Sequence, residues 1–185
     1  MNDRKSIGKN CSMCVQPAFI IGTYNEDGSA NFAPITWVSV TWKDDHYMLV
    51  ISMNGTKQTK QNASRTKMLS ANLVSTDMLN LMDYFGSISG KEVAKDEIPH
   101  EYGNGITLNV PTLNASKWVY ECEVAEIYQT GDSDTYFCPI KDVQIDKTID
   151  ISNGIDLTLF NPVIYSGGYH SIGKYLGKIG DFYNQ

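Results

Sequence analysis

The alternation of apolar and polar residues predicts a β-hairpin near the start of the chain. Residues 18–24 form an apolar run of strand length, and residues 25–28 form a turn whose glycine can adopt positive φ. From Ser29 the chain runs back as a second strand. That strand contains Pro34, which cannot donate a ladder hydrogen bond and therefore belongs at a sheet edge or a bulge. The backbone near Pro34 is accordingly expected to be free to meet a ligand or another chain.

Three further segments extend the predicted sheet, and a helix interrupts them. Residues 38–43 alternate with the period of a half-buried strand, and residues 47–53 are nearly all apolar, as in a central strand. Residues 68–75 form a third predicted strand, which is short. Residues 56–67 are polar but compatible with a helix, and they have little apolar face. This pattern predicts a short helix on the surface that contributes little to core packing.

The second half of the chain adds a clear helix and another hairpin. Asp77 is expected to cap a helix that ends at Gly86 and whose apolar side chains recur at helical spacing. These side chains are Met78, Leu81, Met82 and Phe85. Residues 116–124 and 135–146 are two predicted strands, joined through a turn at residues 131–134.

The segment between the helix and the second hairpin, residues 86–115, is rich in Gly, Asn, Pro and charge. It is expected to be a long irregular excursion that functions or covers a partner. The whole chain, residues 1–185, is expected to form a single domain with an N-terminal lead at residues 1–15. Six or seven mostly antiparallel strands and two helical segments predict a mainly β fold, a small antiparallel β-barrel with helices at its mouth.

Charge and hydropathy narrow the class of partner. Fifteen basic and 21 acidic residues give a net charge of -6, so the field around the protein repels nucleic acids and acidic membranes. The N-terminus has no apolar signal region, and nowhere do 18 consecutive apolar residues occur. We therefore expect no nucleic acid partner, no membrane insertion and a cytoplasmic location.

Candidates for side-chain catalysis and metal binding are few. His46, His100 and His170 lie in no recognisable nucleophile motif, so no catalytic residue is predicted. Cys11 and Cys14 have the two-residue spacing of a zinc ligand pair or a redox pair. No second pair supplies the other two ligands that a structural zinc needs. Two reduced cysteines in the N-terminal lead are the preferred interpretation, and a metal site shared between subunits stays open.

A phosphate site is suggested where the predicted central strand runs into the polar helix. Residues 53–59 offer amide donors, two hydroxyl groups and the lysine Lys57 at a helix start. These groups could bind a phosphate that carries about two negative charges. The same residues also suit an ordinary turn and helix cap, and the spacing does not decide between the two. No Walker loop or dinucleotide fingerprint occurs.

Four blocks of sequence follow one another along nearly the whole chain. They comprise Gln16-Pro17, Gly22-Thr23, Asp27-Gly28, Asn31 and Trp37; Thr59, Asn62 and Asn72-Leu73; Asp83 to Gly86, Ser89-Gly90 and Lys95; and Pro162 to Tyr165, Gly167-Gly168, Tyr169, Gly173 and Gly177. In order and spacing these blocks together resemble the flavin reductase-like, FMN-binding split-barrel family, which includes flavoredoxins. Two positions depart from that family's pattern: Lys57 stands in a segment where an arginine is common, and Cys138-Pro139 where a glycine is common.

The resemblance implies FMN as the cofactor and assigns residues to it. Five residues are expected at the isoalloxazine ring: Ala33, Pro34, Ile35, Thr36 and Trp37. Five are expected along the ribityl chain and phosphate: Ser52, Met53, Asn54, Lys57 and Thr59. Ser89 and Lys95 belong to a segment expected to cover the cofactor. The resemblance further implies a homodimer with each FMN near the subunit interface.

The function implied is that of an oxidoreductase in which FMN takes hydride from NADH or NADPH and passes electrons to free flavin or a protein acceptor. An alternative is an FMN-binding electron-transfer or carrier protein without a nicotinamide site. A third interpretation is a split barrel that has lost flavin and serves only as a binding module. The electron acceptor and the choice between NADH and NADPH stay open.

Overall fold

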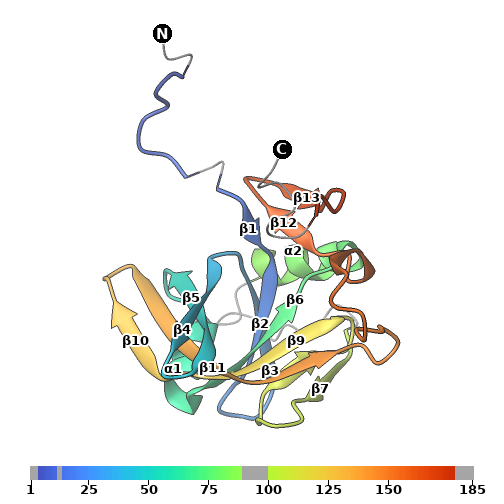
Figure 1. Ribbon diagram of the computed structural model, residues 1–185. Helices are drawn as coiled ribbons and strands as arrows, with labels where there is room; N and C mark the ends of the chain where they lie inside the picture. The colour runs from blue at the N-terminus through green and yellow to red at the C-terminus, as the bar shows by residue number, and fades with distance from the viewer. Residues whose placement is uncertain (1–3, 12–13, 89–99, 178–185) are drawn as a thin grey trace.

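The computed structural model describes residues 4–11, 14–88 and 100–177, and most of its regular structure is antiparallel β-sheet (Figure 1). The main sheet has eight strands: β2 (Phe19–Tyr24), β3 (Ala30–Ile35), β4 (Val38–Lys43), β5 (His46–Asn54), β6 (Met68–Leu73), β9 (Trp118–Glu123), β10 (Glu126–Gln129) and β11 (Ser133–Ile145). Their order is β3-β2-β6-β9-β11-β5-β4, with β10 paired to β11. This result confirms the predicted mainly β fold.

The connection between β3 and β4 shows that the sheet curls into a barrel. These strands stand at opposite ends of the strand order, yet β3 ends at Ile35 and β4 begins at Val38. Two residues, Thr36 and Trp37, therefore join the first and last strands of the order. A connection this short requires the two ends of the sheet to lie close together. Pro34 sits in the terminal strand β3, as its missing N–H requires.

Smaller elements flank the barrel. They are β1 (Gln16–Pro17), β12 (Val163–Tyr165) and β13 (Tyr169–Ser171), which form a three-stranded sheet, the two-stranded sheet of β7 (Tyr102–Asn104) and β8 (Pro111–Leu113), the helices α1 (Gln58–Thr66) and α2 (Leu79–Ser87), and the 3₁₀ turns η1 (Thr76–Met78) and η2 (Leu157–Leu159). Figure 1 shows β1, β12 and β13 at the same end of the barrel as α2. No helix among the described residues has the length and apolar character to cross a membrane.

Strand alternation divides the apolar core into two clusters. In β2, Ile21 belongs to the cluster that fills the barrel together with Leu49 and Ile51 of β5. Its neighbour Ile20 points the other way and packs in the cluster with Phe85 of α2. Successive side chains of a strand face opposite sides. One face of β2 therefore packs in the barrel interior, and its other face packs against α2.

Helix α1 corrects the expectation of a surface helix without a packing role. Thr59, Asn62 and Ala63 are all buried. The Asn62 Nδ2 group donates to Thr23 Oγ1 at 3.2 Å and to Asn25 Oδ1 at 2.7 Å. The buried side of α1 is thus mostly polar and hydrogen-bonded to the first hairpin, a form of packing that a search for an apolar face does not detect.

Helix α2 corrects the predicted cap. Asp77 lies in the 3₁₀ turn η1, and α2 begins at Leu79 without a side-chain capping hydrogen bond. The helix continues to Ser87, one residue beyond the predicted end at Gly86. Its apolar positions are nevertheless buried as their spacing predicts, and they are Leu81, Met82 and Phe85. A Cβ atom at Gly86 would lie 3.2 Å from Pro34 Cγ, so α2 packs closely on β3.

The second predicted hairpin is present in part: β9 pairs with the end of β11, but the turn at residues 131–134 joins β11 to the additional strand β10. Residues 140–145 of β11 pair with β9, whereas residues 133–139 pair with β5 and, in part, with β10. A register shift between Ile140 and Asp142 accompanies the change, just after Pro139. The excursion at residues 86–115 is not wholly irregular, because its described part contains the β7–β8 hairpin.

Candidate functional site

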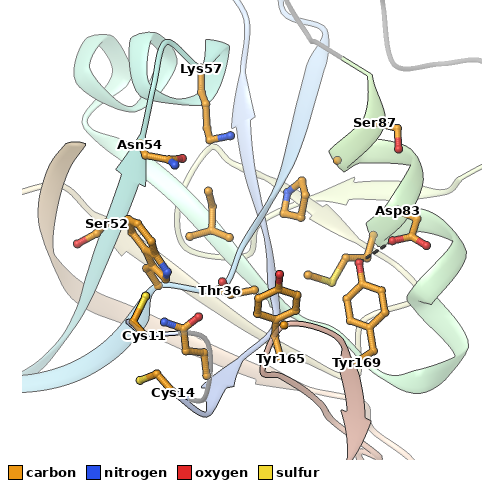
Figure 2. Close-up of a pocket in the computed structure, with 17 residues that line it drawn as sticks. Cys11, Cys14, Thr36, Ser52, Asn54, Lys57, Asp83, Ser87, Tyr165 and Tyr169 are labelled. Carbon is orange, nitrogen blue, oxygen red and sulfur yellow. Dashed lines mark hydrogen bonds between the residues drawn. The ribbon is translucent and has the colours of Figure 1, made fainter. Parts of the chain in front are cut away.

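A cavity of about 530 Å³ lies beside the two-residue connection that closes the barrel (Figure 2). Its walls come from the lead before β1, the ends of β3 and β5, the start of α1, helix α2 and the β12–β13 turn. The lining residues are Cys11, Cys14, Gln16, Pro34, Ile35, Thr36, Trp37, Ser52, Asn54, Lys57, Met82, Asp83, Gly86, Ser87, Tyr165, Gly167 and Tyr169. The volume lies within the usual range for pockets that hold small molecules and cofactors, about 300–1,000 Å³.

The connection at residues 36–37 is held in place by backbone hydrogen bonds. The Ser52 N–H donates to the Trp37 carbonyl at 2.9 Å, and the Val38 N–H donates to the Thr36 carbonyl at 3.0 Å. Trp37 remains 43% exposed, a large apolar side chain at the edge of the cavity. A fixed, non-strand backbone beside an exposed indole is suited to bind a flat ligand.

The opposite end of the cavity is formed where β5 passes into α1. Gly55 takes φ 63°, which turns the chain, and Lys57 is the N-cap residue with no side-chain capping hydrogen bond. Figure 2 shows the Lys57 side chain reaching into the cavity. The first-turn amides of a helix have no intrahelical acceptor and attract anions, and this first turn contains no acidic residue. The Lys57 side chain and the start of α1 thus lie at one end of the cavity.

A tyrosine and a carboxylate connect the wall formed by α2 to the small sheet. The Tyr169 hydroxyl donates to Asp83 Oδ1 at 2.5 Å, and the rings of Tyr165 and Tyr169 lie 6.0 Å apart. Burial and the adjacent Asp83 carboxylate raise the pKa of Tyr169 to about 12. Tyr169 therefore keeps its proton throughout the neutral range and acts as a hydrogen-bond donor.

The structure brings many of the sequence-predicted residues to this cavity. Those that line it are Pro34, Ile35, Thr36, Trp37, Ser52, Asn54 and Lys57. Ala33, Met53 and Thr59 are buried and are not among the lining residues. The Thr59 Oγ1 atom instead accepts a hydrogen bond from Asn31 Nδ2 at 2.9 Å. Ser89 and Lys95 lie outside the described residues.

Another part of the lining was not among the predicted site residues. It consists of Cys11, Cys14, Gln16, Met82, Asp83, Gly86, Ser87, Tyr165, Gly167 and Tyr169. Several of these lie in the sequence blocks that carry the family resemblance, which was the one available signal for them. The sequence alone did not predict that the N-terminal lead lies at the cavity. Its position depends on the pairing of Gln16 with Tyr165, which is almost the full length of the chain away.

Within the described ranges, no group of three His, Cys, Asp or Glu side chains is arranged to hold a metal ion. None of the three histidines of the chain lines the cavity. The described part of the site consists of backbone, apolar and aromatic side chains, hydroxyl groups, side-chain amides, the Asp83 carboxylate, one lysine and a thiol pair. Such a set can bind and orient a flat anionic ligand, and it points to chemistry carried by that ligand.

Comparison with known proteins identifies a domain family and a relative of known activity. The profile of the flavin reductase-like domain matches residues 12–173. An NADH-dependent FMN reductase, RutF of Acinetobacter baylyi, is 24% identical over 125 residues, which cover 68% of this chain and 64% of that protein, just under two thirds of its length.

Solved structures agree. Flavoredoxin of Desulfovibrio vulgaris (Miyazaki F) is 20% identical with a TM-score of 0.89, covering 97% of this chain and 98% of that one. A flavin reductase with a split barrel domain from Shewanella frigidimarina is 18% identical with a TM-score of 0.82, covering 92% and 88%. The split-barrel fold predicted from the sequence is thereby confirmed, and the FMN cofactor predicted from the sequence agrees with the family. The chain belongs to the flavin reductase-like domain family.

Proposed function

We propose that the cavity holds FMN and that the protein passes electrons from NADH or NADPH through this cofactor to free flavin or a protein acceptor, in the cytoplasm. The observation that carries the proposal is the polarity of the cavity. One end offers Lys57 at the start of α1, and the other offers the two-residue backbone connection with Trp37. FMN has the matching polarity, with an anionic phosphate at one end and a flat aromatic ring system at the other.

The fit at the phosphate end depends on α1. Lys57 supplies a positive charge, and the start of the nine-residue helix supplies amide donors. A lysine acts as a point charge, without the two-pronged geometry of an arginine. We therefore assign most of the directional binding to backbone amides and the charge neutralisation to Lys57. Thr59 supports this end indirectly, through its hydrogen bond with Asn31.

The ring end depends on the connection between β3 and β4. Pro34, Thr36 and Trp37 line it, and backbone amides there can stabilise negative charge on a reduced ring. When bound, FMN supplies the hydride and electron chemistry, so no side chain needs to act as acid or base. The chain's residues bind and orient the cofactor and exclude water from one side of it.

A homodimer is part of the proposal. Val40, Trp42 and Tyr47 lie on the paired strands β4 and β5 and are 60%, 54% and 61% exposed. The Trp42 and Tyr47 rings contact each other, with centroids 4.6 Å apart. This patch continues the barrel wall away from Trp37. A second copy of the chain would bury this patch.

The absorption spectrum of purified protein with added FMN tests cofactor binding first. A protein that takes up no FMN would leave only a binding module without flavin. Steady-state oxidation of NADH and NADPH by the FMN-loaded protein then separates the reductase from the carrier. We expect turnover with at least one of the two, and no turnover with either would favour the electron carrier without a nicotinamide site.

A further inference from the structure

Two thiols line the proposed flavin cavity, and the proposed function does not use them. Cys11 and Cys14 both contribute to its wall. Figure 2 shows them together, at the end of the cavity away from Lys57. Since the phosphate is assigned to the Lys57 end, the cysteine pair lies at the end assigned to the ring. The other two cysteines, Cys122 and Cys138, are buried in the barrel core.

The position of the pair follows from strand pairing. Gln16 of β1 pairs with Tyr165 of β12, and both residues line the cavity. In an extended chain, successive side chains face opposite sides. Gln16 and Cys14 accordingly both line the cavity, whereas Val15 between them is 68% exposed. The β1–β12 ladder thus directs Cys14 toward the site.

A backbone hydrogen bond brings the two cysteines close together. The Cys14 N–H donates to the Cys11 carbonyl at 3.0 Å. A hydrogen bond from the N–H of residue i+3 to the carbonyl of residue i keeps the Cα atoms of these two residues within about 7 Å of each other. Disulfides join Cα atoms about 4.4–6.8 Å apart. This hydrogen bond therefore holds Cys11 and Cys14 at a separation from which a disulfide can form.

A metal site explains the pair less well, because within the described ranges no third His, Cys, Asp or Glu completes a ligand group. Both thiols are also exposed to solvent, as a pair that exchanges with a redox partner requires. Cys122 and Cys138 differ from this pair because both are buried. Burial raises the pKa of Cys138 to about 12 and that of Cys122 well above its ordinary value, so these two remain unreactive thiols.

We infer that Cys11 and Cys14 form a redox-active dithiol and disulfide pair that exchanges two electrons with the flavin in this cavity. The inference rests on the proposed function and identifies the disulfide as the first electron acceptor of the reduced flavin. The disulfide takes two electrons and one proton from the reduced flavin, and a second proton comes from solvent. The S–S bond breaks, both sulfurs become thiols, and the flavin returns to its oxidised form. The reverse step oxidises the dithiol.

Counting electrons and thiols under anaerobic conditions tests the inference. The FMN-loaded protein is first oxidised with diamide, which is then removed, and it is titrated with dithionite while the flavin absorbance is followed. We expect the wild type to take four electrons per FMN, two for the flavin and two for the disulfide. The Cys11→Ser/Cys14→Ser variant should take two. Thiol labelling after denaturation should rise from two to four per chain in the wild type, since the sequence has four cysteines.

The buried cysteines Cys122 and Cys138 serve as the internal control, because both should react with the thiol label before and after the titration. Wild-type protein without FMN, given the same dithionite, should keep two thiols over the same time, which shows that the flavin delivers the electrons. The inference is overturned if diamide forms no Cys11–Cys14 disulfide, if the wild type takes only two electrons, or if the thiols return equally fast without FMN. Failure to load FMN at all would overturn the proposed function itself, and the flavin spectrum reports that failure separately.

Discussion

At the scale of single residues, the fold is fixed by a few buried polar groups with specific partners. The Glu121 carboxylate is fully buried on β9. It accepts hydrogen bonds from the backbone N–H groups of Ile106 at 2.6 Å and Thr107 at 3.0 Å, and further ones from the Leu108 N–H and the Gln144 amide. One carboxylate thus organises the turn between β7 and β8. A sequence pattern cannot identify such a residue, because its donors are backbone groups of a loop.

Replacing Glu121 by alanine should lower the free energy of unfolding by about 2–4 kcal/mol, because several buried donors lose their acceptor. Glu123→Ala is the matched control on the same strand. Its ion pair with Lys141, at 3.0 Å, is exposed, and its loss should cost at most about 1 kcal/mol. Urea unfolding followed by circular dichroism measures both variants. Equal small losses would show that the carboxylate does not hold the turn.

The phosphate end of the proposed site also depends on one residue. Lys57→Ala should weaken FMN binding about tenfold, the equivalent of about 1.4 kcal/mol for a lost charge-assisted contact. Riboflavin lacks the phosphate, so its affinity should stay unchanged. Quenching of flavin fluorescence measures both affinities. Lys147→Ala removes the same charge from an exposed loop and should affect neither. An equal loss for FMN and riboflavin would place the phosphate elsewhere.

At the scale of elements, the site depends on how closely the strands and helices approach one another. Pro34 in the terminal strand contacts helix α2 near Gly86, which sets the width of the cavity between them. Another close approach holds the β7–β8 hairpin against the barrel. A Cβ atom at Gly22 of β2 would lie 2.4 Å from the Pro111 carbonyl oxygen and 2.5 Å from Ser70 Oγ. Only glycine leaves room for the hairpin there.

Gly22→Ala should therefore destabilise the protein by about 1–3 kcal/mol through overpacking, although alanine is otherwise the better strand residue. Gly173→Ala is the control, because no atom lies within 4 Å of its would-be Cβ atom. Thermal unfolding compares the two with the wild type. A wild-type melting temperature for Gly22→Ala would mean that β8 does not press against β2.

At the scale of the whole molecule, the exposed aromatic patch on β4 and β5 supports assembly. Trp42 and Tyr47 stay largely exposed although their rings contact each other. An exposed apolar group of this kind is a common mark of an interface. The net charge of -6 keeps copies apart at long range, so apolar contact must supply the attraction in a dimer.

We expect Trp42→Asp to shift the protein from dimer to monomer, because a carboxylate at the centre of an apolar interface loses its hydration without a partner. Sedimentation velocity measures the change. Ile106→Asp is the control, since Ile106 is 81% exposed on the β7–β8 turn, outside the patch. A monomeric wild type, or a Trp42→Asp variant that remains a dimer, would contradict this interface.

Hydrophobic patterning by itself determined the local elements. The hairpin around residues 25–28, the central strand at residues 47–53 and the buried face of α2 agree with the structure. These elements can be predicted because their buried side chains are apolar and recur at a regular spacing, and both properties are local in sequence. The sequence blocks also determined the family. Patterning failed at α1, where buried side chains such as Asn62 are polar and find partners in a distant hairpin.

Only the tertiary structure decided which residues share the cavity. The chain closes its barrel through Thr36 and Trp37, and the β1–β12 ladder brings Cys11 and Cys14 beside them. The seven lining residues predicted from sequence come from two neighbouring segments. The thiols instead reach the cavity through the pairing of β1 with β12, which are almost the whole chain apart, and Tyr169 through the β12–β13 hairpin. The physical reason is that register between distant strands is set by the sum of many weak contacts, which leave no local mark in the sequence.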